Sequence, residues 1–472
     1  MKKRPHVLFM VVDDLRPLLG CYGHKEMKTP HLDRLASEGV LFERNLSQVP
    51  ICMASRASFM TSQKPFKHQI YNCKTVAELM PDLPTLNQHF ASAGYRVKGT
   101  GKVYHHGSDN ESQFGDGYTQ TTGEAFGRGY LTEASRKLID ENSREREARG
   151  LGPEDPLGGR GPCTEIGPPD EEKYPDGAIA AWGVEQLREL KNTEDPFFLA
   201  LGWRKPHLPF VAPQSYWDLY DPEMLPFPEN DFMPEDMPEY TKGYHYSELR
   251  NYVDVPYGQE PLSEALDRRL LQGYRACVSF LDAQVGKVLQ ALDENGLRED
   301  TVVVFMVDHG FQLREHDLFC KHTAFMTSYH VPMLVRAPGV TEVGGRIAGL
   351  SENIDIFPTL CELCGLDQPA EIDGESRVNW LRTPSLGGKE AAFSVWGVSK
   401  REDPEQVIVG YTVVTDRYRY TEWTHNASGE VKARELFRLE YDPLETLNLA
   451  GRDEYVEVMQ GLSLLISDWR AD

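Results

Sequence analysis

Two short apolar runs in this sequence of 472 residues lead directly into acidic residues. The runs cover residues 6–12 and 301–307, and they are followed by Asp13, Asp14, Asp308 and His309. Such runs are typical of strands buried on both faces of a mostly parallel sheet, and the carboxyl ends of those strands form a ligand crevice. Three carboxylates and an imidazole in one crevice favour a hard divalent cation, Ca²⁺ or Mg²⁺, over zinc. The alternative is that each acid caps the helix that follows it.

A third chemically distinctive segment covers residues 52–61, with the sequence CMASRASFMT. It places Cys52, Arg56 and several hydroxyl groups within ten residues, after Pro50 and ahead of a predicted helix. Taken alone, the segment fits a buried thiol beside an ordinary helix. Taken together with the distant acidic and basic residues, it indicates a nucleophile that awaits modification.

Six basic residues lie in similar contexts, at strand ends or in loops. They are Arg56, Lys102, His105, Lys205, His207 and Lys321. A metal ion together with several cations stabilises the negative oxygens around a sulfuryl or phosphoryl group during its transfer. A single residue of this kind is more often a solvated side chain, so the hypothesis depends on their combination. The sequence contains no P-loop, G-x-S-x-G or H-E-x-x-H motif.

An alternation of strands and helices is predicted to position these residues. Strands are predicted at 6–12, 40–42, 95–99, 196–202, 301–307 and 331–335, and helices at 30–38, 83–93, 131–146, 177–191 and 266–292. Long loops are expected within 106–172 and 221–262, where periodicity is lost. Strands at 392–396, 407–414 and 418–423 have hairpin spacing, and a helix at 453–470 follows. This pattern predicts a large α/β domain over 1–375 and a smaller α+β subdomain over 376–472.

Composition indicates a soluble globular protein, with 40% hydrophobic and 26% charged residues. The formal charge of −23 argues against a nucleic-acid partner, whose phosphates require a basic surface. No run reaches the ~18 apolar residues of a membrane span, so no membrane partner is expected. The same acidic excess means that any anion site must be locally basic.

The first residues resemble a signal peptide, but the apolar run is short, has no small-residue cleavage site and ends in acids. We therefore expect a cytoplasmic location for the chain as given, and a periplasmic or secreted one if it is a mature form. The eight cysteines are irregularly spaced, which does not suggest a disulfide framework. Cys361 and Cys364 lie in an apolar predicted helix and are interpreted as core residues rather than zinc ligands.

The segment Cys52-x-Ala54-Ser55-Arg56 with Thr61 resembles the signature of the type I sulfatase family. Other blocks resemble the family as well: VVDDLR at 11–16, GKVYH at 101–105, RKPHLPF at 204–210, DHGFQLREH at 308–316, Lys321 and YDPLETLNL at 441–449. Ser62 stands where the family usually has glycine, and Ala54 where proline is commoner. The resemblance implies an alkaline-phosphatase-like fold, with a large mixed sheet flanked by helices and a small C-terminal antiparallel sheet plus helix.

The resemblance also implies roles for the residues. Cys52 would be oxidised by a formylglycine-generating maturase to 3-oxoalanine (formylglycine), whose hydrate attacks sulfur. The implied ligands of Ca²⁺, with Mg²⁺ as the alternative, are Asp13, Asp14, residue 52, Asp308 and His309. Arg56 and Lys102 would stabilise the hydrate, and His105 would act as its general base. Lys102, Lys205, His207 and Lys321 would contact the substrate, and either of the last two could protonate the leaving oxygen.

Within the family, the Lys-Pro-His-x-Pro-Phe block and His309 resemble the iduronate-2-sulfatase branch. The implied substrate is a 2-O-sulfated uronic acid residue in glycosaminoglycan-like or other polysaccharide fragments. Two enzymatic alternatives remain: a phosphonate monoester or phosphodiester hydrolase with the same modified cysteine, and a sulfatase for another small ester such as choline sulfate or an aryl sulfate. A binding protein with an unmodified thiol is the non-catalytic alternative.

Overall fold

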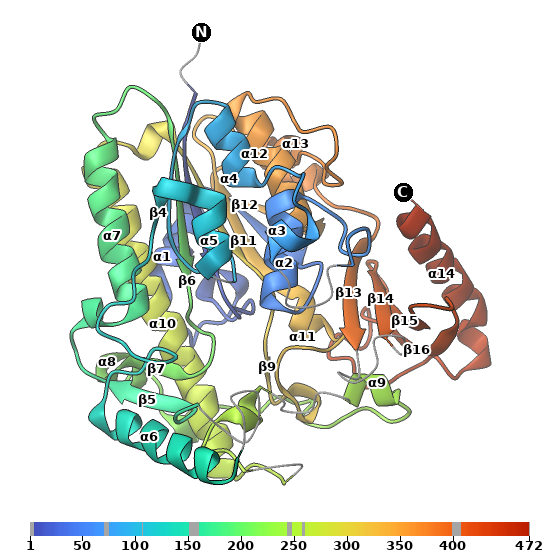
Figure 1. Ribbon diagram of the computed structural model, residues 1–472. Helices are drawn as coiled ribbons and strands as arrows, with labels where there is room; N and C mark the ends of the chain where they lie inside the picture. Colours follow the sequence, from blue (N-terminus) through green and yellow to red (C-terminus); the bar gives the residue numbers. More distant parts are fainter. Residues whose placement is uncertain are drawn as a thin grey trace.

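The computed structural model describes residues 4–69, 75–105, 107–150, 160–242, 248–256, 260–398 and 407–471. Its centre is an eight-stranded sheet in the order β12-β2-β11-β8-β1-β6-β3-β4 (Figure 1). The strands are β1 (His6–Val12), β2 (Val40–Leu46), β3 (Arg96–Gly101), β4 (Tyr118–Thr119), β6 (Phe197–Trp203), β8 (Thr301–Val307), β11 (His330–Arg336) and β12 (Gly345–Glu352). Only β11 runs antiparallel to its neighbours among these strands, so the sheet is mixed, as expected.

Strand β1 lies in the middle of the sheet and is buried on both faces. Its side chains alternate between two cores: Leu8, Met10 and Val12 belong to one, and Val7, Phe9 and Val11 to the other. This alternation follows from the two-residue period of a strand, and it explains why residues 7–12 are all apolar. A sheet with two apolar faces needs helices on both sides.

Helices cover both faces of the sheet. On the face of Leu8 lie α1 (Pro30–Glu38), α7 (Pro175–Leu190) and α10 (Glu264–Glu294). On the face of Val7 lie α2 (Cys52–Thr61), α4 (Leu86–Ser92) and α12 (Ile356–Cys364), with α3 (Val76–Leu79), α5 (Gly107–Phe114) and α13 (Val378–Arg382) nearby.

Cys361 and Cys364 are both buried in α12, which confirms them as core residues. Among the described residues, no helix combines the length and apolar character needed to cross a membrane.

The carboxyl ends of β1, β3, β6 and β8 lie on one side of the sheet, because these strands are parallel. The connections on this side form a layer of short elements, seen below the sheet in Figure 1. They are α6 (Glu133–Ala148), β5 (Thr164–Gly167), β7 (Phe210–Pro213), α8 (Gln214–Trp217), α9 (Glu239–Lys242), β9 (Gln312–Leu313), β10 (Phe319–Cys320) and α11 (Met326–Tyr329). This layer encloses the acids that follow β1 and β8.

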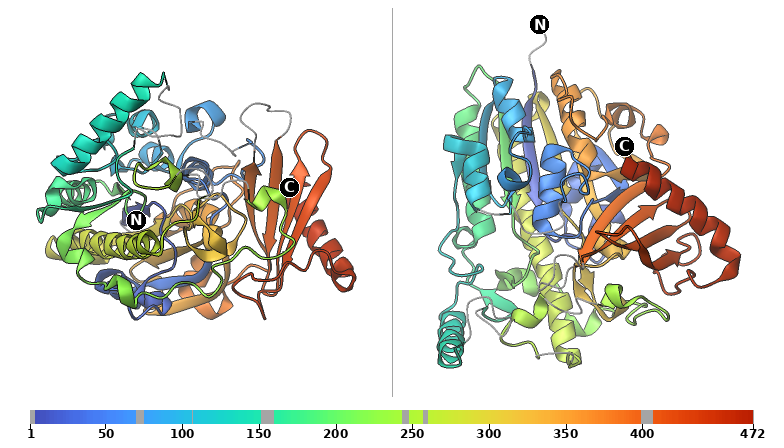
Figure 2. Two further views of the ribbon diagram at one scale, coloured as in Figure 1. Left: turned by 90° about the horizontal axis from the view of Figure 1, so that it is seen from below. Right: turned by 45° about the vertical axis from the view of Figure 1, so that its right-hand side comes forward.

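A separate four-stranded antiparallel sheet follows, in the order β13-β14-β15-β16. Its strands are β13 (Ala392–Val398), β14 (Ile408–Val414), β15 (Arg419–His425) and β16 (Val431–Phe437). Helix α14 (Val456–Ala471) packs on its outer face, while Trp396 and Trp423 on the other face pack against Leu46 and Tyr329 of the main body (Figure 2). The small C-terminal antiparallel sheet with a helix is therefore confirmed. The domain boundary at 375/376 stays a prediction.

Several predicted elements need correction. The Cys52 segment was expected to precede a helix, but it forms the helix: α2 begins at Cys52 itself. Strands β12 and β16 and helix α5 were not predicted. Residues 106 and 151–159 of one predicted loop, and 243–247 and 257–259 of the other, lie outside the described residues, as does Cys73.

Candidate active site and metal centre

Four predicted site residues converge at the carboxyl side of the main sheet. They are Asp13 after β1, Cys52 at the start of α2, and Asp308 and His309 after β8. One ligand atom from each lies within 4.8 Å of the other three, and all four residues are buried. We call this set the acid–thiol cluster. Its closest side-chain contact is between the Nε2 atom of His309 and the Sγ atom of Cys52, at 3.2 Å.

The acid–thiol cluster has the properties of a site for a hard cation. The Oδ1 atom of Asp13 is buried and accepts no hydrogen bond from the described residues. A buried carboxylate oxygen without a donor is costly, and a bound cation would remove that cost. The pKa of His309 is raised to about 10, because Asp308 and Cys52 together outweigh the lowering caused by burial. A metal ion would displace the proton that His309 then carries.

Asp14 lies next to the acid–thiol cluster but points to another partner. Both of its carboxylate oxygens accept hydrogen bonds from the Nζ atom of Lys321, at 2.9 and 2.8 Å. Its Oδ1 atom is also 3.3 Å from the Nδ1 atom of His309. Burial raises the pKa of Asp14 more than Lys321 lowers it. Asp14 therefore links the predicted metal ligands to the predicted sulfate-binding lysine.

Arg56 holds the edge of the acid–thiol cluster from inside α2. Its Nε atom donates to the Oδ2 atom of Asp308 at 2.9 Å, and its Nη1 atom donates to the carbonyl of Val103 at 3.1 Å and to that of Lys102. Its Nη2 atom is 3.7 Å from the Oδ1 atom of Asp13. The guanidinium is fully buried, and its pKa is raised because Asp308 and Asp13 outweigh burial. Arg56 thus joins the ends of β1, β3 and β8.

Lys102 follows β3 and donates a hydrogen bond to the Oδ2 atom of Asp13. Burial raises the pKa of Asp13, but Lys102, His207 and Arg56 together bring it well below its usual value. Asp13 is therefore ionised, as a metal ligand must be. His105 lies three residues further along the chain, is partly buried and is not among the four ligand groups.

His207 and Lys321 form the second part of the site. The Nε2 atom of His207 is 3.9 Å from the Oδ2 atom of Asp14, and its Nδ1 atom is 2.5 Å from the carbonyl oxygen of Leu208. The carbonyl fixes the proton on Nδ1, so Nε2 is the nitrogen that faces Asp14 and Glu248. Burial and Lys321 lower the pKa of His207 well below 6.5. The pKa of Lys321 is raised, because Asp14 and other nearby anions outweigh burial.

Lys205 is placed differently from what the sequence suggested. Its Nζ atom donates to the carbonyl oxygens of His207, at 2.9 Å, and Pro209, at 2.6 Å. Its backbone amide donates to the Oδ2 atom of Asp176 at 2.8 Å. The side chain is buried and holds the turn that presents His207. The hydrogen bonds of its ammonium group thus lie within that turn rather than in the acid–thiol cluster.

Three residues of the site were not predicted from the sequence: Glu248, Arg128 and Arg160. The Oε2 atom of Glu248 is 2.9 Å from the Nζ atom of Lys321, and its Oε1 atom is 3.3 Å from the Nε2 atom of His207. Arg128 and Arg160 lie on its outer side. All three come from stretches without periodicity or a family motif, so no signal in the sequence pointed to them.

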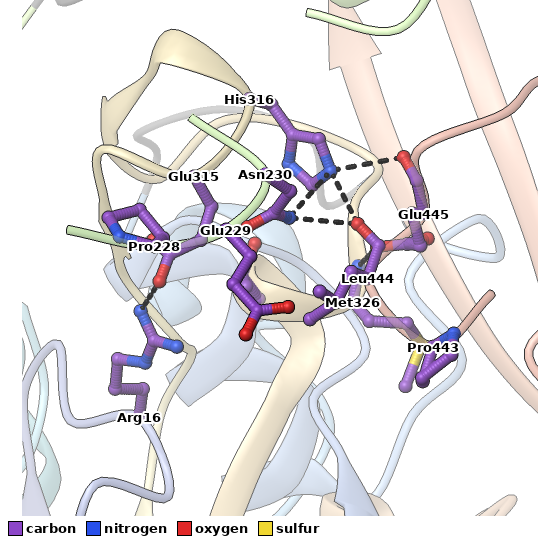
Figure 3. Close-up of a pocket in the computed structure, with 11 residues that line it drawn as sticks. Arg16, Pro228, Glu229, Asn230, Glu315, His316, Met326, Pro443, Leu444 and Glu445 are labelled. Carbon is purple, nitrogen blue, oxygen red and sulfur yellow. Dashed lines mark hydrogen bonds and ion pairs between the residues drawn. The ribbon is translucent and has the colours of Figure 1, made fainter. Parts of the chain in front are cut away.

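A separate cavity of about 310 Å³ lies where the loops after β1 and β8 meet the C-terminal residues (Figure 3). Its walls include Arg16, Glu315, His316 and Glu445, and none of the acid–thiol cluster. Arg16 pairs with Glu315 at 2.5 Å, and the Nε2 atom of His316 is 3.0 Å from the carbonyl oxygen of Leu444. None of the predicted catalytic, metal-binding or substrate-binding residues lines this cavity, so it is distinct from the predicted reaction site.

Residues 5–366 match the family model described as Sulfatase, and residues 314–472 match the model described as N-sulphoglucosamine sulphohydrolase, C-terminal. Iduronate 2-sulfatase of Mus musculus is 29% identical over 97% of this chain and 93% of its own. The solved phosphonate monoester hydrolase of Agrobacterium radiobacter has a TM-score of 0.76 at 23% identity, covering 99% of this chain and 96% of its own. A solved 2-O GAG sulfatase has a TM-score of 0.75 at 21% identity, covering 99% and 92%.

The two solved structures share the fold, and the Sulfatase model covers well over half of the sequence. The motifs at the ends of β1 and β8 and at the start of α2 meet at the carboxyl side of the sheet, in a buried group of potential metal ligands. We conclude that this chain belongs to the sulfatase family of hydrolases.

Proposed function

We propose that the chain removes sulfate from 2-O-sulfated uronic acid residues of polysaccharide-derived oligosaccharides. The observation that carries this proposal is the convergence of Cys52, Asp13, Asp308 and His309 within 4.8 Å of one another. A thiol at a helix start, beside two carboxylates and an imidazole, is where a modified residue and a divalent cation could share a ligand set. The 29% identity with the mouse iduronate 2-sulfatase supports the choice of substrate.

The nucleophile in this proposal is residue 52 after conversion by a maturase. Oxidised to formylglycine and hydrated, it would supply one hydroxyl that attacks sulfur while the bond from sulfur to the sugar oxygen breaks, and a second hydroxyl whose loss of a proton would expel sulfate and restore the aldehyde. Asp13, Asp14, Asp308 and His309 would hold Ca²⁺, with Mg²⁺ as the alternative, and the ion would supply positive charge that stabilises the transferring sulfuryl group. The start of α2 adds the partial positive charge of a helix N-terminus at the same place.

The residues around residue 52 have distinct tasks. Arg56 and Lys102 are assigned to stabilise negative charge on the attacking hydroxyl. Their ion pairs with Asp308 and Asp13 place both cations beside the acid–thiol cluster. His105 is assigned to take the proton of the second hydroxyl. His207 and Lys321 bind the sulfate, and one of them delivers a proton to the leaving sugar oxygen. Lys205 contributes by holding the turn of His207, from its hydrogen bonds to that turn.

The first experiment is mass spectrometry of the peptide that contains residue 52, from protein made in a host with a formylglycine-generating maturase. We expect the mass of formylglycine, and an unaltered cysteine would contradict the proposed nucleophile. The Cys52→Ala variant should lose about 10⁴-fold or more in kcat, as is usual when a covalent nucleophile is removed. It should fold normally, because alanine fits at a helix start.

The second experiment measures release of the anion from a panel of defined substrates. It contains disaccharides sulfated at uronate O2, disaccharides sulfated at other positions, choline sulfate, 4-nitrophenyl sulfate and the phosphate analogue of the last. We expect the highest kcat/KM for the 2-O-sulfated uronate. A preference for phosphate would favour the phosphonate and phosphodiester hydrolases, and a preference for another sulfate ester would move the chain to another branch.

A further inference from the structure

A group of charged side chains lies beside the sulfate-binding pair His207 and Lys321 and is not explained by the chemistry at residue 52. It consists of Glu248, Arg128 and Arg160. The Oε1 atom of Glu248 is 3.6 Å from the Nη1 atom of Arg160 and 3.8 Å from the Nη2 atom of Arg128. Its other oxygen is 2.9 Å from the Nζ atom of Lys321. One carboxylate therefore spans the distance between the proposed sulfate site and the two arginines.

The two arginines keep hydrogen-bonding capacity for a ligand. Their distances to Glu248 exceed those of a good hydrogen bond. The Nη1 atom of Arg160 is buried and donates no hydrogen bond to a described residue. The side chain of Arg128 is 40% exposed and that of Arg160 is 24% exposed, whereas Glu248 on their inner side is only 10% exposed. The two arginine side chains are therefore more exposed than their carboxylate partner, although the Nη1 atom of Arg160 itself is buried.

The position of Arg160 is fixed by an aromatic side chain. Its guanidinium lies 5.2 Å from the ring centre of Tyr252, which is buried. An arginine that rests on an aromatic ring keeps its planar donors in one orientation, and this arrangement suits bidentate recognition of a carboxylate. Burial raises the pKa of Glu248, but Lys321, His207 and Arg160 together bring it well below its usual value, so this carboxylate is ionised.

The charges of Arg128, Arg160 and Glu248 indicate which kind of ligand the two arginines can bind. Two guanidinium groups against the single carboxylate of Glu248 leave one positive charge, which is enough to pair with one more carboxylate. The chain carries a net charge of −23, so a substrate with two negative groups would be repelled except where cations are concentrated. In a 2-O-sulfated uronate, the sulfate and the carboxylate lie on opposite sides of one sugar ring. Lys321 of the sulfate-binding pair lies against one carboxylate oxygen of Glu248, and the two arginines lie against the other oxygen, which His207 also approaches.

We propose that Arg128 and Arg160 form a carboxylate-binding subsite, so that the enzyme selects sugars that carry both a sulfate ester and a carboxylate. Glu248 is a positioning residue that holds Lys321 and the arginines in place on either side of it. The segments that contribute the arginines lie around α6 and β5, on the carboxyl side of the main sheet (Figure 1). This inference rests on the proposed function and deepens it, because it assigns residues to the second anionic group of the substrate.

The test compares Arg128→Gln and Arg160→Gln with the wild type on two sulfate esters. One is a 2-O-sulfated uronate disaccharide, and the other is 4-nitrophenyl sulfate, which has no carboxylate. We expect KM for the disaccharide to rise about 10- to 100-fold, the range expected for a lost charge-assisted hydrogen bond, with kcat nearly unchanged. KM for 4-nitrophenyl sulfate should change less than about twofold. Equal losses on both substrates, or no loss on either, would overturn the subsite.

Two further variants separate binding from folding. Arg160→Lys keeps the charge but loses the bidentate fork, so its KM for the disaccharide should lie between those of the wild type and Arg160→Gln. Arg96→Gln removes an exposed arginine that pairs with Asp195 at the opposite end of β3, and it should behave as the wild type. Melting temperatures of all variants show whether any loss is structural.

A binding measurement keeps the inference testable if the proposed reaction fails. Calorimetry with the unsulfated uronate disaccharide, and with the same disaccharide after reduction of its carboxylate to an alcohol, requires no turnover. We expect the wild type to prefer the carboxylate form and Arg160→Gln to lose that preference. If the wild type binds both forms equally, the subsite is excluded, even where sulfate release supports the proposed function. If the preference is present but no sulfate is released, the proposed function fails and the subsite stands.

Discussion

Two groups of buried charges in this molecule look similar at first and differ in one respect. The acid–thiol cluster has been described above; the second group, here called the docking cluster, consists of Arg419, Glu435 and Glu445. Glu435 accepts hydrogen bonds from Arg419 at 2.9 Å and from the indole of Trp423 at 2.8 Å. Glu445 accepts from the Nε atom of Arg419 and, at 2.8 Å, from the amide of Met326. All four carboxylate oxygens of the docking cluster thus have a donor.

The acid–thiol cluster is not satisfied in this way. The Oδ1 atom of Asp13 accepts no hydrogen bond from the described residues, and the Nη2 atom of Arg56 lies 3.7 Å from it. A carboxylate cluster whose oxygens are all paired needs no ligand, whereas one with an orphan oxygen is completed by a cation. The docking cluster therefore joins two parts of the fold, and the acid–thiol cluster is arranged for a ligand.

The largest difference between the clusters should appear when Asp13 is changed to asparagine. This variant keeps the shape of the side chain and removes a proposed metal ligand, so kcat/KM should fall on the order of 10³-fold. A chelator should lower the melting temperature of the wild type and leave that of Asp13→Asn unchanged, because ligand binding stabilises only a protein that binds it. Calorimetry with Ca²⁺ and Mg²⁺ measures the lost affinity directly.

The exposed Asp195→Asn variant is the matched control for removal of one charge, and it should keep both activity and the response to chelator. If Asp13→Asn retained its calcium affinity, the acid–thiol cluster would not be the metal site.

The docking cluster should respond in the opposite way. Arg419→Met leaves Glu435 and Glu445 buried without their cation, which typically costs about 3–5 kcal/mol of stability. The urea midpoint should fall accordingly, whereas kcat of the folded protein should change little. Adding Glu435→Gln and Glu445→Gln to this variant should restore part of the stability, because the uncompensated charges are then gone. A large fall in kcat of the folded Arg419→Met protein would contradict this expectation, because it would show that the docking cluster also contributes to catalysis.

Acid should weaken the packing of His316, which lies beside Glu445 of the docking cluster. His316 stacks on Phe325 with ring centres 3.6 Å apart, and its pKa is lowered to about 4, mainly by burial. The unfolded chain takes up this proton near pH 6.5 and the folded one near pH 4. The neutral ring therefore contributes up to about 3 kcal/mol that is present above pH 6.5 and is lost as the pH falls to 4.

Urea midpoints between pH 7.5 and 4 measure this contribution. The His316→Gln variant should be less stable than the wild type at pH 7.5, and its stability should decline less steeply with acid. His24→Gln, at an exposed histidine, is the control and should follow the wild type. If the urea midpoints of His316→Gln and the wild type fell equally steeply with pH, the His316 ring would not contribute to the acid sensitivity of the protein.

The smallest effect is expected at the end of α2, where Ser62 replaces the usual glycine of the family. Ser62 has a φ of +54°, a conformation that glycine adopts without strain. Its hydroxyl donates to the carbonyl of Ile354 at 2.7 Å and accepts from the amide of Gly374 at 3.2 Å. Ser62→Gly should relieve about 1 kcal/mol of strain and lose two hydrogen bonds of similar worth, so the net change stays within about 1 kcal/mol. A change of several kcal/mol in the urea midpoint series would show that one effect dominates.

The central strands could be predicted because their environment is uniform. β1 and β8 are buried on both faces, so their sequences are continuous apolar runs, and the acids after them had to meet on one side of a parallel sheet. The same logic failed for α2. All ten of its residues are buried, so it has no polar face and no helical periodicity to mark its start.

The site was predictable where short motifs carry it and unpredictable where loops do. Cys52, Asp13 and Asp308 follow from strand ends and a specific segment. Glu248 and Arg160 lie in stretches without periodicity, and their meeting depends on the folded path of two loops. Lys205 shows the converse: its position next to His207 suggested substrate contact, but nearby carbonyl oxygens take up its ammonium group.

The hydrogen bond from the amide of Met326 to Glu445 has a consequence for the order of events in the cell. Met326 lies five residues after Lys321, so this contact helps to hold the loop that carries the proposed sulfate-binding lysine. The two partners are 119 positions apart in the chain. At typical rates of translation, about 5–20 residues per second, Glu445 is made on the order of ten seconds after Met326. A nascent chain can therefore contain every residue of the acid–thiol cluster and still lack the residue that anchors the loop after Lys321.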